Sequence, residues 1–235
     1  FVLEASPVIN VVHIYGDKSG GYVRSLFANE SIFKANSVSF RNVDPSLLAT
    51  ADLVVLDGVP ELGGSLPTAI QNFVKRGGSL AVFPSATGGN GSNALLAGLG
   101  AFPQPPPKEE GQNSSPLGGG REGAALSPPD TKNPFFEGIF ENTTQKDRME
   151  MPTARAVWQW AGQGASLLRF RDGGSFMSRF AVQRGQVYVC ASPLDDAFTS
   201  FHKHALFVPV MYKMAALSKS RERLAYSFQE PSIAV

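Results

Sequence analysis

Three short apolar runs and one alternating segment, each about as long as a β-strand, recur in the first part of the sequence and are separated by segments of helical pattern. The apolar runs are Val8–Tyr15, Leu53–Leu56 and Ser79–Phe83, and the alternating segment is Ser37–Arg41. Apolar runs of this kind are typical of buried parallel strands. The helical segments are Tyr22–Glu30, a segment that starts at Asp44-Pro45-Ser46, and Leu66–Arg76, which Gly77-Gly78 closes. Strand–helix units repeated at this spacing predict an open α/β sheet with parallel strands.

The second half of the chain has a different pattern and is rich in strands. Glycine-containing turns separate three segments there: Ser166–Arg171, Phe176–Gln183 and Gln186–Ala191. Such turns are typical of hairpins, so the three segments predict an antiparallel meander. A closing helix is expected over Phe201–Leu217. The predicted fold class is therefore α/β, with parallel strands first and antiparallel hairpins in the C-terminal half, either in one sheet or in two adjoining sheets.

The segment from Ser85 to about Pro134 is rich in Gly, Pro, Ser and Asn, and it interrupts the regular pattern. We expect most of it to be a surface excursion, with a short helix over Asn93–Leu99. The expected organisation is a single α/β domain over residues 1–220. That domain carries a Gly/Pro-rich insertion at about 101–133, and residues 221–235 form a C-terminal extension or linker.

Composition restricts the classes of partner and compartment. The net charge is +1 and the basic residues do not cluster, which argues against nucleic acid as a partner. The single cysteine, Cys190, excludes an intramolecular disulfide, and its apolar neighbours predict a buried core residue. No run approaches the roughly 18 apolar residues of a transmembrane helix. The chain opens with Phe1 rather than Met, so we expect any membrane-anchoring segment to lie outside it.

An open α/β sheet usually binds ligands at the carboxyl ends of its strands, and the loops expected there hold few reactive side chains. Three loops would form this crevice: Asp17–Gly21, Asp57–Val59 and Ser85–Gly89. The candidate ligand-binding residues are Asp17, Ser19, Gly20, Gly21, Asp57, Gly58, Ser85, Thr87 and Gly88. A glycine-rich turn at a helix N-terminus can hold an anion through its backbone N–H groups. A tight turn without a ligand is the simpler interpretation of Asp17–Gly21, because it matches no phosphate-binding motif.

Ser85 occupies the position where enzymes of this architecture carry a nucleophile. A serine nucleophile needs a general base within hydrogen-bonding reach, and the chain has only three histidines. His13 lies inside a predicted strand and is expected to be structural. His202 and His204 are two residues apart at the start of the last helix, so they point to different faces and do not form a metal-binding pair. We therefore assign no catalytic residue and no metal ligand, and no cofactor is expected.

The order of several longer segments resembles a known family. These segments are Tyr22–Leu26, Ala51–Pro60, Phe73–Phe83, Asn133–Phe140, Arg184–Val189, Ala191–Asp195 and Ala205–Tyr212. Together they resemble the periplasmic, class I glutamine amidotransferase-like domain of BatA-type bacterial membrane proteins, which are linked to aerotolerance. The resemblance covers nearly the whole chain. It implies a flavodoxin-like, three-layer α/β fold and a domain in the periplasm, tethered to the bacterial inner membrane by segments that this chain lacks.

The resemblance also implies partners, and it does not carry over a reaction. The implied partners are other Bat-type membrane proteins with von Willebrand A domains and a MoxR-type ATPase system. True amidotransferases use a Cys nucleophile after this kind of strand, followed by a His and a Glu. This chain has Pro84-Ser85-Ala86 there, and no His-x-Glu pair follows.

Three functional hypotheses follow from the sequence. The first is a non-catalytic ligand- or protein-interaction domain of a membrane-anchored envelope protein. The second is a glutamine amidotransferase-like or serine hydrolase enzyme that uses Ser85, which requires a histidine close to its hydroxyl. The third is a module that binds an anionic small molecule in the predicted crevice.

Overall fold

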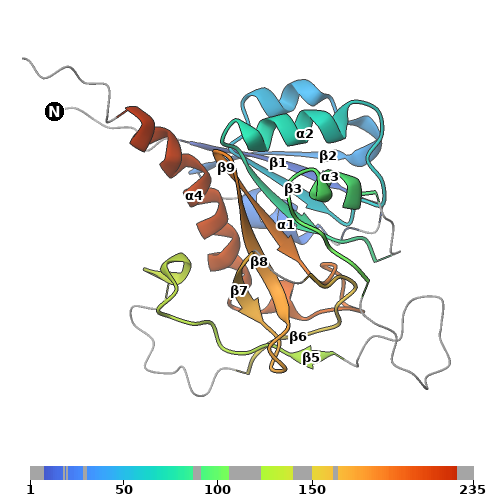
Figure 1. Cartoon of the computed structure of the whole chain (residues 1–235), viewed down its shortest axis with the longest axis vertical. Helices are drawn as coiled ribbons and strands as arrows, with labels where there is room; N and C mark the ends of the chain where they lie inside the picture. Colours follow the sequence, from blue (N-terminus) through green and yellow to red (C-terminus); the bar gives the residue numbers. More distant parts are fainter. Residues whose placement is uncertain are drawn as a thin grey trace, which may run out of the picture.

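The computed structural model describes residues 8–17, 19, 21–28, 31–86, 91–105, 123–139, 150–160 and 164–226. Seven strands form one sheet in the order β2-β1-β3-β4-β9-β8-β7 (Figure 1). The strands are β1 (Ile9–Tyr15), β2 (Phe33–Ser39), β3 (Leu53–Asp57), β4 (Ser79–Phe83), β7 (Ala165–Arg169), β8 (Ser175–Val182) and β9 (Gly185–Cys190). Two further strands, β5 (Ala124–Ala125) and β6 (Thr153–Ala154), pair in a small separate sheet. The predicted α/β class with a mostly parallel central sheet is confirmed.

The meander of the second half joins the parallel strands in one sheet. β9 pairs antiparallel with β8 and parallel with β4, so it belongs to both parts. All six residues of β9 are buried, which matches its position inside the sheet. Of the two arrangements that the sequence left open, the single sheet is therefore the one that forms.

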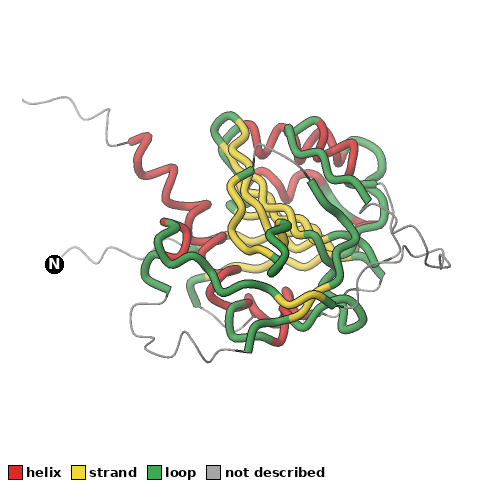
Figure 2. The backbone as a smooth tube through the Cα atoms, turned by 60° about the horizontal axis from the view of Figure 1, so that its bottom comes forward, coloured by secondary structure: helices red, strands yellow, loops and turns green. Residues whose placement is uncertain are grey.

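Helices cover both faces of the sheet. α1 (Tyr22–Ala28) and α4 (Phe207–Tyr226) pack on one face, while α2 (Leu66–Lys75) and α3 (Asn93–Ala97) pack on the other. Figure 2 shows the strands as a twisted stack in the middle of the molecule, with helices to either side. Alternating side chains of the strands enter two separate apolar cores, so that Val11 and Val55 lie in one and Val12 and Val54 in the other. Cys190 is buried as predicted, and burial raises the pKa of its thiol to about 12.

Three predicted elements differ from the structure. β2 begins at Phe33, whereas the pattern placed a strand over Ser37–Arg41, because this edge strand is largely polar and exposed. The helix expected from Asp44 is a 3-10 turn over Pro45–Ala49, although the Asp44 side chain does cap it by accepting from the Ser46 N–H. The closing helix begins only at Phe207, and a 3-10 turn occupies Phe201–Lys203.

The Gly- and Pro-rich segment is not wholly superficial where the structure describes it. The predicted short helix is present as α3, and its Leu95 and Leu96 are buried in the core. Ala101 and Leu126 are also buried, and Leu126 bridges to Phe170 beside the main sheet. Residues 106–122 of the expected insertion lie outside the described residues. Among the described residues, no helix is long and apolar enough to cross a membrane.

The turn between β8 and β9 packs directly on the end of α2, and a glycine makes this contact possible. A Cβ atom at Gly185 would lie 2.0 Å from the Val74 carbonyl oxygen and 2.5 Å from the Gly78 carbonyl oxygen. Both neighbours are backbone atoms, so neither can move without displacing its element. The Gly185 position therefore fixes how the meander sits against the parallel half of the sheet.

Gly185→Ala is expected to lower the free energy of unfolding by about 1–3 kcal/mol, because the added methyl forces backbone shifts in a packed region. Urea denaturation measures this change. Gly63→Ala is the matched control, because a Cβ there meets nothing within 4 Å and the variant should stay within about 0.5 kcal/mol of wild type. Equal effects of the two substitutions would contradict the steric explanation.

Candidate functional site at the carboxyl edge of the sheet

The strand order reverses between β1 and β3, and this point defines the candidate site. From β1 the chain adds β2 on one side and then β3 on the other, in parallel. The carboxyl ends of these strands, at Tyr15 and Asp57, lie level with each other in the sheet register. In open α/β sheets such a reversal opens the crevice in which ligands bind. The predicted loops Asp17–Gly21 and Asp57–Val59 do lie at this edge.

The Asp57 carboxylate is buried at this point and is held by side chains from two other segments. Its Oδ2 accepts a hydrogen bond from the Ser19 hydroxyl, and it lies 3.3 Å from Nε2 of His13. The other ring nitrogen of His13, Nδ1, is hydrogen bonded to the Ser37 hydroxyl at 3.1 Å. His13 and Asp57 are 1% and 2% exposed. A buried carboxylate requires partners of this kind, because its desolvation costs several kcal/mol.

The His13 network was only partly expected from the sequence. His13 was interpreted as a structural residue, and it does lie inside β1, but it also joins the candidate residues Ser19 and Asp57 through hydrogen bonds. Ser37 was not among the predicted site residues. It stands directly beside His13 in the register of β1 and β2, and only that register reveals the contact.

The crevice itself is closed at its base by backbone packing. The Gly16 N–H donates to the Asp57 carbonyl oxygen at 2.8 Å. A Cβ atom at Gly16 would lie only 2.0 Å from the carbonyl oxygen of Gly58, which adopts a φ of +64°. The backbones of the two strand ends are thus in direct contact at Gly16 and Gly58.

Two further candidate ligand-binding residues, Asp17 and Gly21, form contacts with nearby parts of the chain. Asp17 forms an exposed ion pair with Arg41, whose Nη1 donates to Oδ1 at 2.7 Å. Gly21 has a φ of +74°, and its N–H donates to the Ser19 hydroxyl oxygen at 3.4 Å, which closes the turn before α1. The candidates Gly20, Thr87 and Gly88 lie outside the described residues.

A second polar cluster joins the start of α1 to the loop after β9. The rings of Tyr22 and His202 are stacked with centroids 3.9 Å apart. His202 Nε2 and the Lys203 ammonium each lie 2.7 Å from the same oxygen of Asp196. Hydrogen bonds from Lys203 and then from His202 lower the pKa of Asp196, and the bond to Asp196 raises the pKa of Lys203. Sequence reasoning missed this cluster, because the loop that holds Asp196, His202 and Lys203 meets Tyr22 only in the folded chain.

The structure does not bring Ser85 and a histidine into a nucleophile–base pair. Ser85 is 7% exposed at the end of β4. The ring nitrogens of His13 bond to Ser37 and Asp57, and those of His204 bond to the backbone of Glu150 and Leu206. His202 Nε2 bonds to Asp196, while its buried Nδ1 has no hydrogen-bond partner among the described residues. Among the residues that the structure describes, no group of three or more His, Cys, Asp and Glu side chains is arranged to hold a metal ion.

Comparisons with known proteins show the fold alone. No protein-family model matches the chain, and no curated protein does. The cytoplasmic protein STM3548 from Salmonella typhimurium is similar in structure, with a TM-score of 0.60 and 11% identity over 88% of this chain and 98% of that one. The cytoplasmic protein STM1381 from Salmonella typhimurium LT2 is also similar, with a TM-score of 0.56 and 10% identity over 92% of this chain and 99% of that one. A β-galactosidase from Rahnella sp. R3 has a TM-score of 0.54 and 15% identity. The match covers 91% of this chain but only 32% of the enzyme.

Asp57→Ala is expected to lower the free energy of unfolding by about 2–3 kcal/mol, because it leaves the buried ring of His13 and the half-buried hydroxyl of Ser19 without this partner. Asp17→Ala is the matched control at the end of the neighbouring strand. Its ion pair with Arg41 is solvent-exposed, so removing it should cost less than about 1 kcal/mol. Urea denaturation of both variants gives the comparison, and similar losses would show that Asp57 does not organise this edge.

Proposed function

We propose that the chain is a non-catalytic interaction domain of a membrane-anchored bacterial envelope protein, similar to the periplasmic domain of BatA-type proteins. The observation that carries the proposal is the closed carboxyl edge. The polar groups that would bind a substrate there, above all Asp57, are engaged with one another, and Gly16 packs against Gly58. A domain whose polar groups at the usual reaction site are bonded to one another is suited to recognition by its surface.

The finer fold assignment is part of this proposal. Five parallel strands run in the order β2-β1-β3-β4-β9, which corresponds to the 2-1-3-4-5 order of flavodoxin-like sheets. β9 thus takes the place of the fifth strand, and β8 and β7 extend the sheet beyond it. This order supports a flavodoxin-like, class I glutamine amidotransferase-like domain. No amidotransferase activity follows, because the position after β4 is Pro84-Ser85-Ala86.

Phe102 supplies an exposed apolar contact of the kind that recognition surfaces use. Its side chain is 63% exposed and is the most exposed large hydrophobic side chain among the described residues. The segment that carries it is well anchored. Ala101 is buried and donates to the Leu96 carbonyl oxygen, and the backbones of Gln104 and Gln159 exchange two hydrogen bonds of 2.8 Å. A rigid apolar anchor binds a partner with little loss of entropy.

By resemblance, the partner of this surface is a Bat-type protein with a von Willebrand A domain, which acts with a MoxR-type ATPase system. The proposed location is the periplasmic side of the bacterial inner membrane. We expect the purified chain to bind such a von Willebrand A domain in biolayer interferometry, and Phe102→Ser to weaken the affinity by about tenfold or more. Ile32→Ser, at a side chain that is 43% exposed near β2, is the control and should leave the affinity unchanged. Absence of binding by the wild-type chain would reject the proposed partner.

A specific observation favours serine hydrolysis as the second candidate function. Ser37, His13 and Asp57 are joined by hydrogen bonds in the order of a catalytic triad. The setting differs, however, from that of known nucleophiles. Ser37 lies within β2, two residues before its end, whereas nucleophilic serines of α/β enzymes stand on sharp turns beside oxyanion-binding N–H groups.

A serine-reactive fluorophosphonate probe separates the two candidate functions. We expect no labelling of the native chain above the level of the heat-denatured chain, because in the described part of the chain Ser85 bonds to no histidine and Ser37 lies within a strand rather than on a turn. Ser37→Ala and Ser85→Ala identify the residue if labelling does occur. Labelling that disappears in one of these variants would make the chain a hydrolase and would overturn the non-catalytic proposal.

A further inference from the structure

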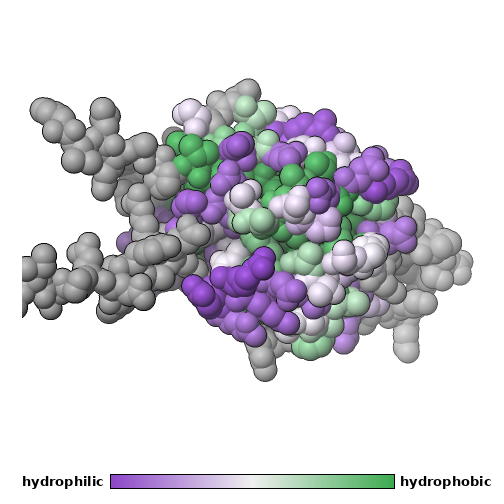
Figure 3. Space-filling view, turned by 90° about the horizontal axis from the view of Figure 1, so that it is seen from above, coloured by the Kyte–Doolittle hydropathy of each residue, from purple (hydrophilic) through white to green (hydrophobic). Residues whose placement is uncertain are grey.

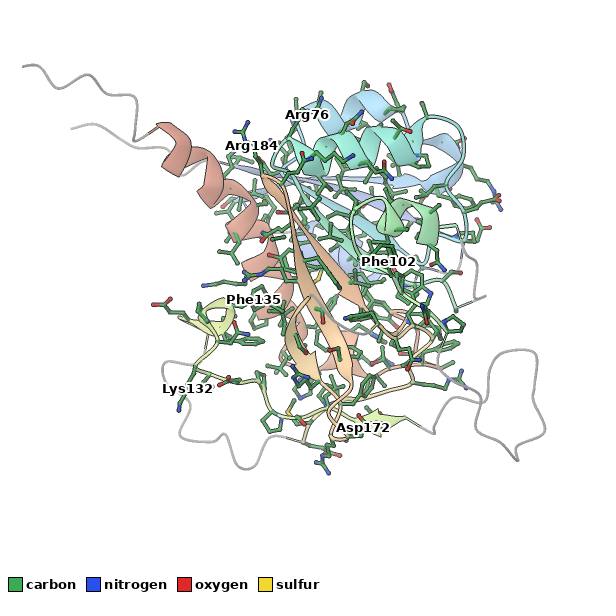
Figure 4. The ribbon with its side chains drawn as sticks, viewed as in Figure 1. Arg76, Phe102, Lys132, Phe135, Asp172 and Arg184 are labelled. Carbon is green, nitrogen blue, oxygen red and sulfur yellow. The ribbon has the colours of Figure 1, made fainter. Side chains whose placement is uncertain are left out.

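The sheet ends in two outermost strands, β2 and β7, and the described part of the chain covers only one of them. Residues 125–127 cover the end of β7 through backbone hydrogen bonds to Arg169 and Arg171. β2 pairs with β1 on one side and with no described strand on the other. The two strands lie far apart, since Figure 4 shows Asp172, in the turn after β7, at the lower end of the molecule, and β2 lies in its upper part (Figure 1).

The backbone groups on the open side of β2 are available for pairing. The Ile9 N–H donates to the Ile32 carbonyl oxygen, and this bond sets which residues of β2 face β1. Because the backbone groups of a strand alternate between its two sides, those of Phe33, Ala35 and Ser37 face away from β1. Within the described part of the chain, these groups bond to no other backbone group. An outermost strand of this kind can accept a further strand.

The side chains of β2 are complementary to those of a second copy of the same strand. In an antiparallel pair whose two-fold axis passes through Ala35, Ile32 stands opposite Val38 of the second copy. Ile32 is 43% exposed and Val38 is half-buried, so this contact removes apolar surface from water. Lys34 then stands opposite Asn36 of the second copy, so that no like charges face each other. The symmetry repeats both contacts in the other half of the interface.

The neighbouring registers are less favourable. A two-fold axis at Lys34 would place two lysines directly opposite each other, and like charges in that position are destabilising. An axis at Asn36 would place Lys34 opposite the apolar Val38. The net charge of the chain is only +1, so two copies repel each other weakly.

The mixed polarity of β2 is compatible with an interface. Figure 3 shows hydrophilic and hydrophobic side chains interspersed over the upper face of the molecule. Interfaces between proteins that also exist separately are about as apolar as the rest of the surface, so a broad apolar patch is not required. β2 is also paired with β1 along its whole length, from Phe33 to Ser39, so it is already extended and loses little entropy when a second strand joins it.

We propose that the chain forms a two-fold dimer in which the β2 strands of two copies pair antiparallel about Ala35 and join the two sheets into one. The outward N–H and carbonyl groups of Ala35 bond to those of Ala35 in the second copy. A single pair of strands is a small interface, so we expect a dissociation constant on the order of 10–100 μM. The inference uses neither the carboxyl edge nor Phe102, so it does not depend on the function proposed above.

Sedimentation velocity of the full chain at concentrations from about 1 μM to about 500 μM tests the dimer. We expect monomers at the lower concentrations and dimers at the higher ones. Ile32→Ser should weaken the association about fivefold or more, because it removes the apolar contact from both halves of the interface. Val208→Ser is the matched control, since Val208 is 44% exposed on α4, and it should associate as wild type does. A chain that stays monomeric throughout, or equal effects of the two substitutions, would overturn the proposal.

Asn36→Asp tests the register. It places a carboxylate opposite Lys34 of the second copy in both halves of the interface, so it should tighten the association about threefold or more at low salt. Asn36→Lys should weaken it by a similar factor. Both substitutions are at an exposed side chain, and urea denaturation checks that the variants remain folded. Weaker association of Asn36→Asp would mean that two carboxylates face each other, and the axis at Ala35 would then be wrong.

Hydrogen exchange locates the contact in the dimer. The outward amides of Phe33, Ala35 and Ser37 should exchange more slowly at high protein concentration than at low concentration, because pairing protects them. The exposed turn at residues 171–173 is the control and should exchange alike at both concentrations. A dimer that left the β2 amides unprotected would show that two copies meet at another surface, which would contradict the proposal.

Discussion

The buried carboxylate of Asp57 is the interaction on which the carboxyl edge of this sheet depends. It stands at the end of the central strand β3, where water cannot reach it, so the chain must supply its partners. Ser19 does so by folding the loop after β1 back over β3, and that fold sets the start of α1 one turn later. Tyr22, the first residue of α1, can then stack on His202 from the loop after β9. A single charge thereby links three loops that are distant in the sequence.

The sequence predicted best those elements whose burial is uniform. β1, β3 and β4 are almost wholly buried, so they read as continuous apolar runs and were placed within one residue at either end. β2 has the opposite character, since its residues Lys34–Asn36 are exposed at the edge of the sheet and give no apolar pattern. The Asp44 cap was recognised correctly, yet the segment that follows is too short for an α-helix and forms a 3-10 turn. Local signals thus located the buried strands and the Asp44 cap, while tertiary packing decided the bounds of β2 and the type of the segment after Asp44.

The candidate site could be located from the sequence, although its contacts could not. Topology alone places Ser19, Asp57 and Ser85 near the carboxyl ends of parallel strands. The contact of His13 with Ser37 depends on which residues of β1 and β2 stand level, and this register is set by the whole sheet rather than by any local motif. The stacking of Tyr22 on His202 likewise requires the loop after β9 to fold back against α1. Interactions of this kind follow from the assembled fold, so a single sequence does not indicate them.

The two edges of the sheet differ in the space that their close backbone contacts leave, and the difference has a physical origin. At the carboxyl edge the acidic groups are satisfied within the chain, by Ser19 and His13 for Asp57 and by Arg41 for Asp17. At the amino edge the glycines that allow α2 and the β8–β9 turn to touch have no side chains to fill the space beside them. Each turn also places an arginine immediately before its glycine, at Arg76 and Arg184. Close backbone packing therefore leaves a cavity with guanidinium groups at its rim. An edge whose acidic groups are satisfied within the chain is suited to holding the fold together, whereas the amino edge retains open space beside its glycine contacts.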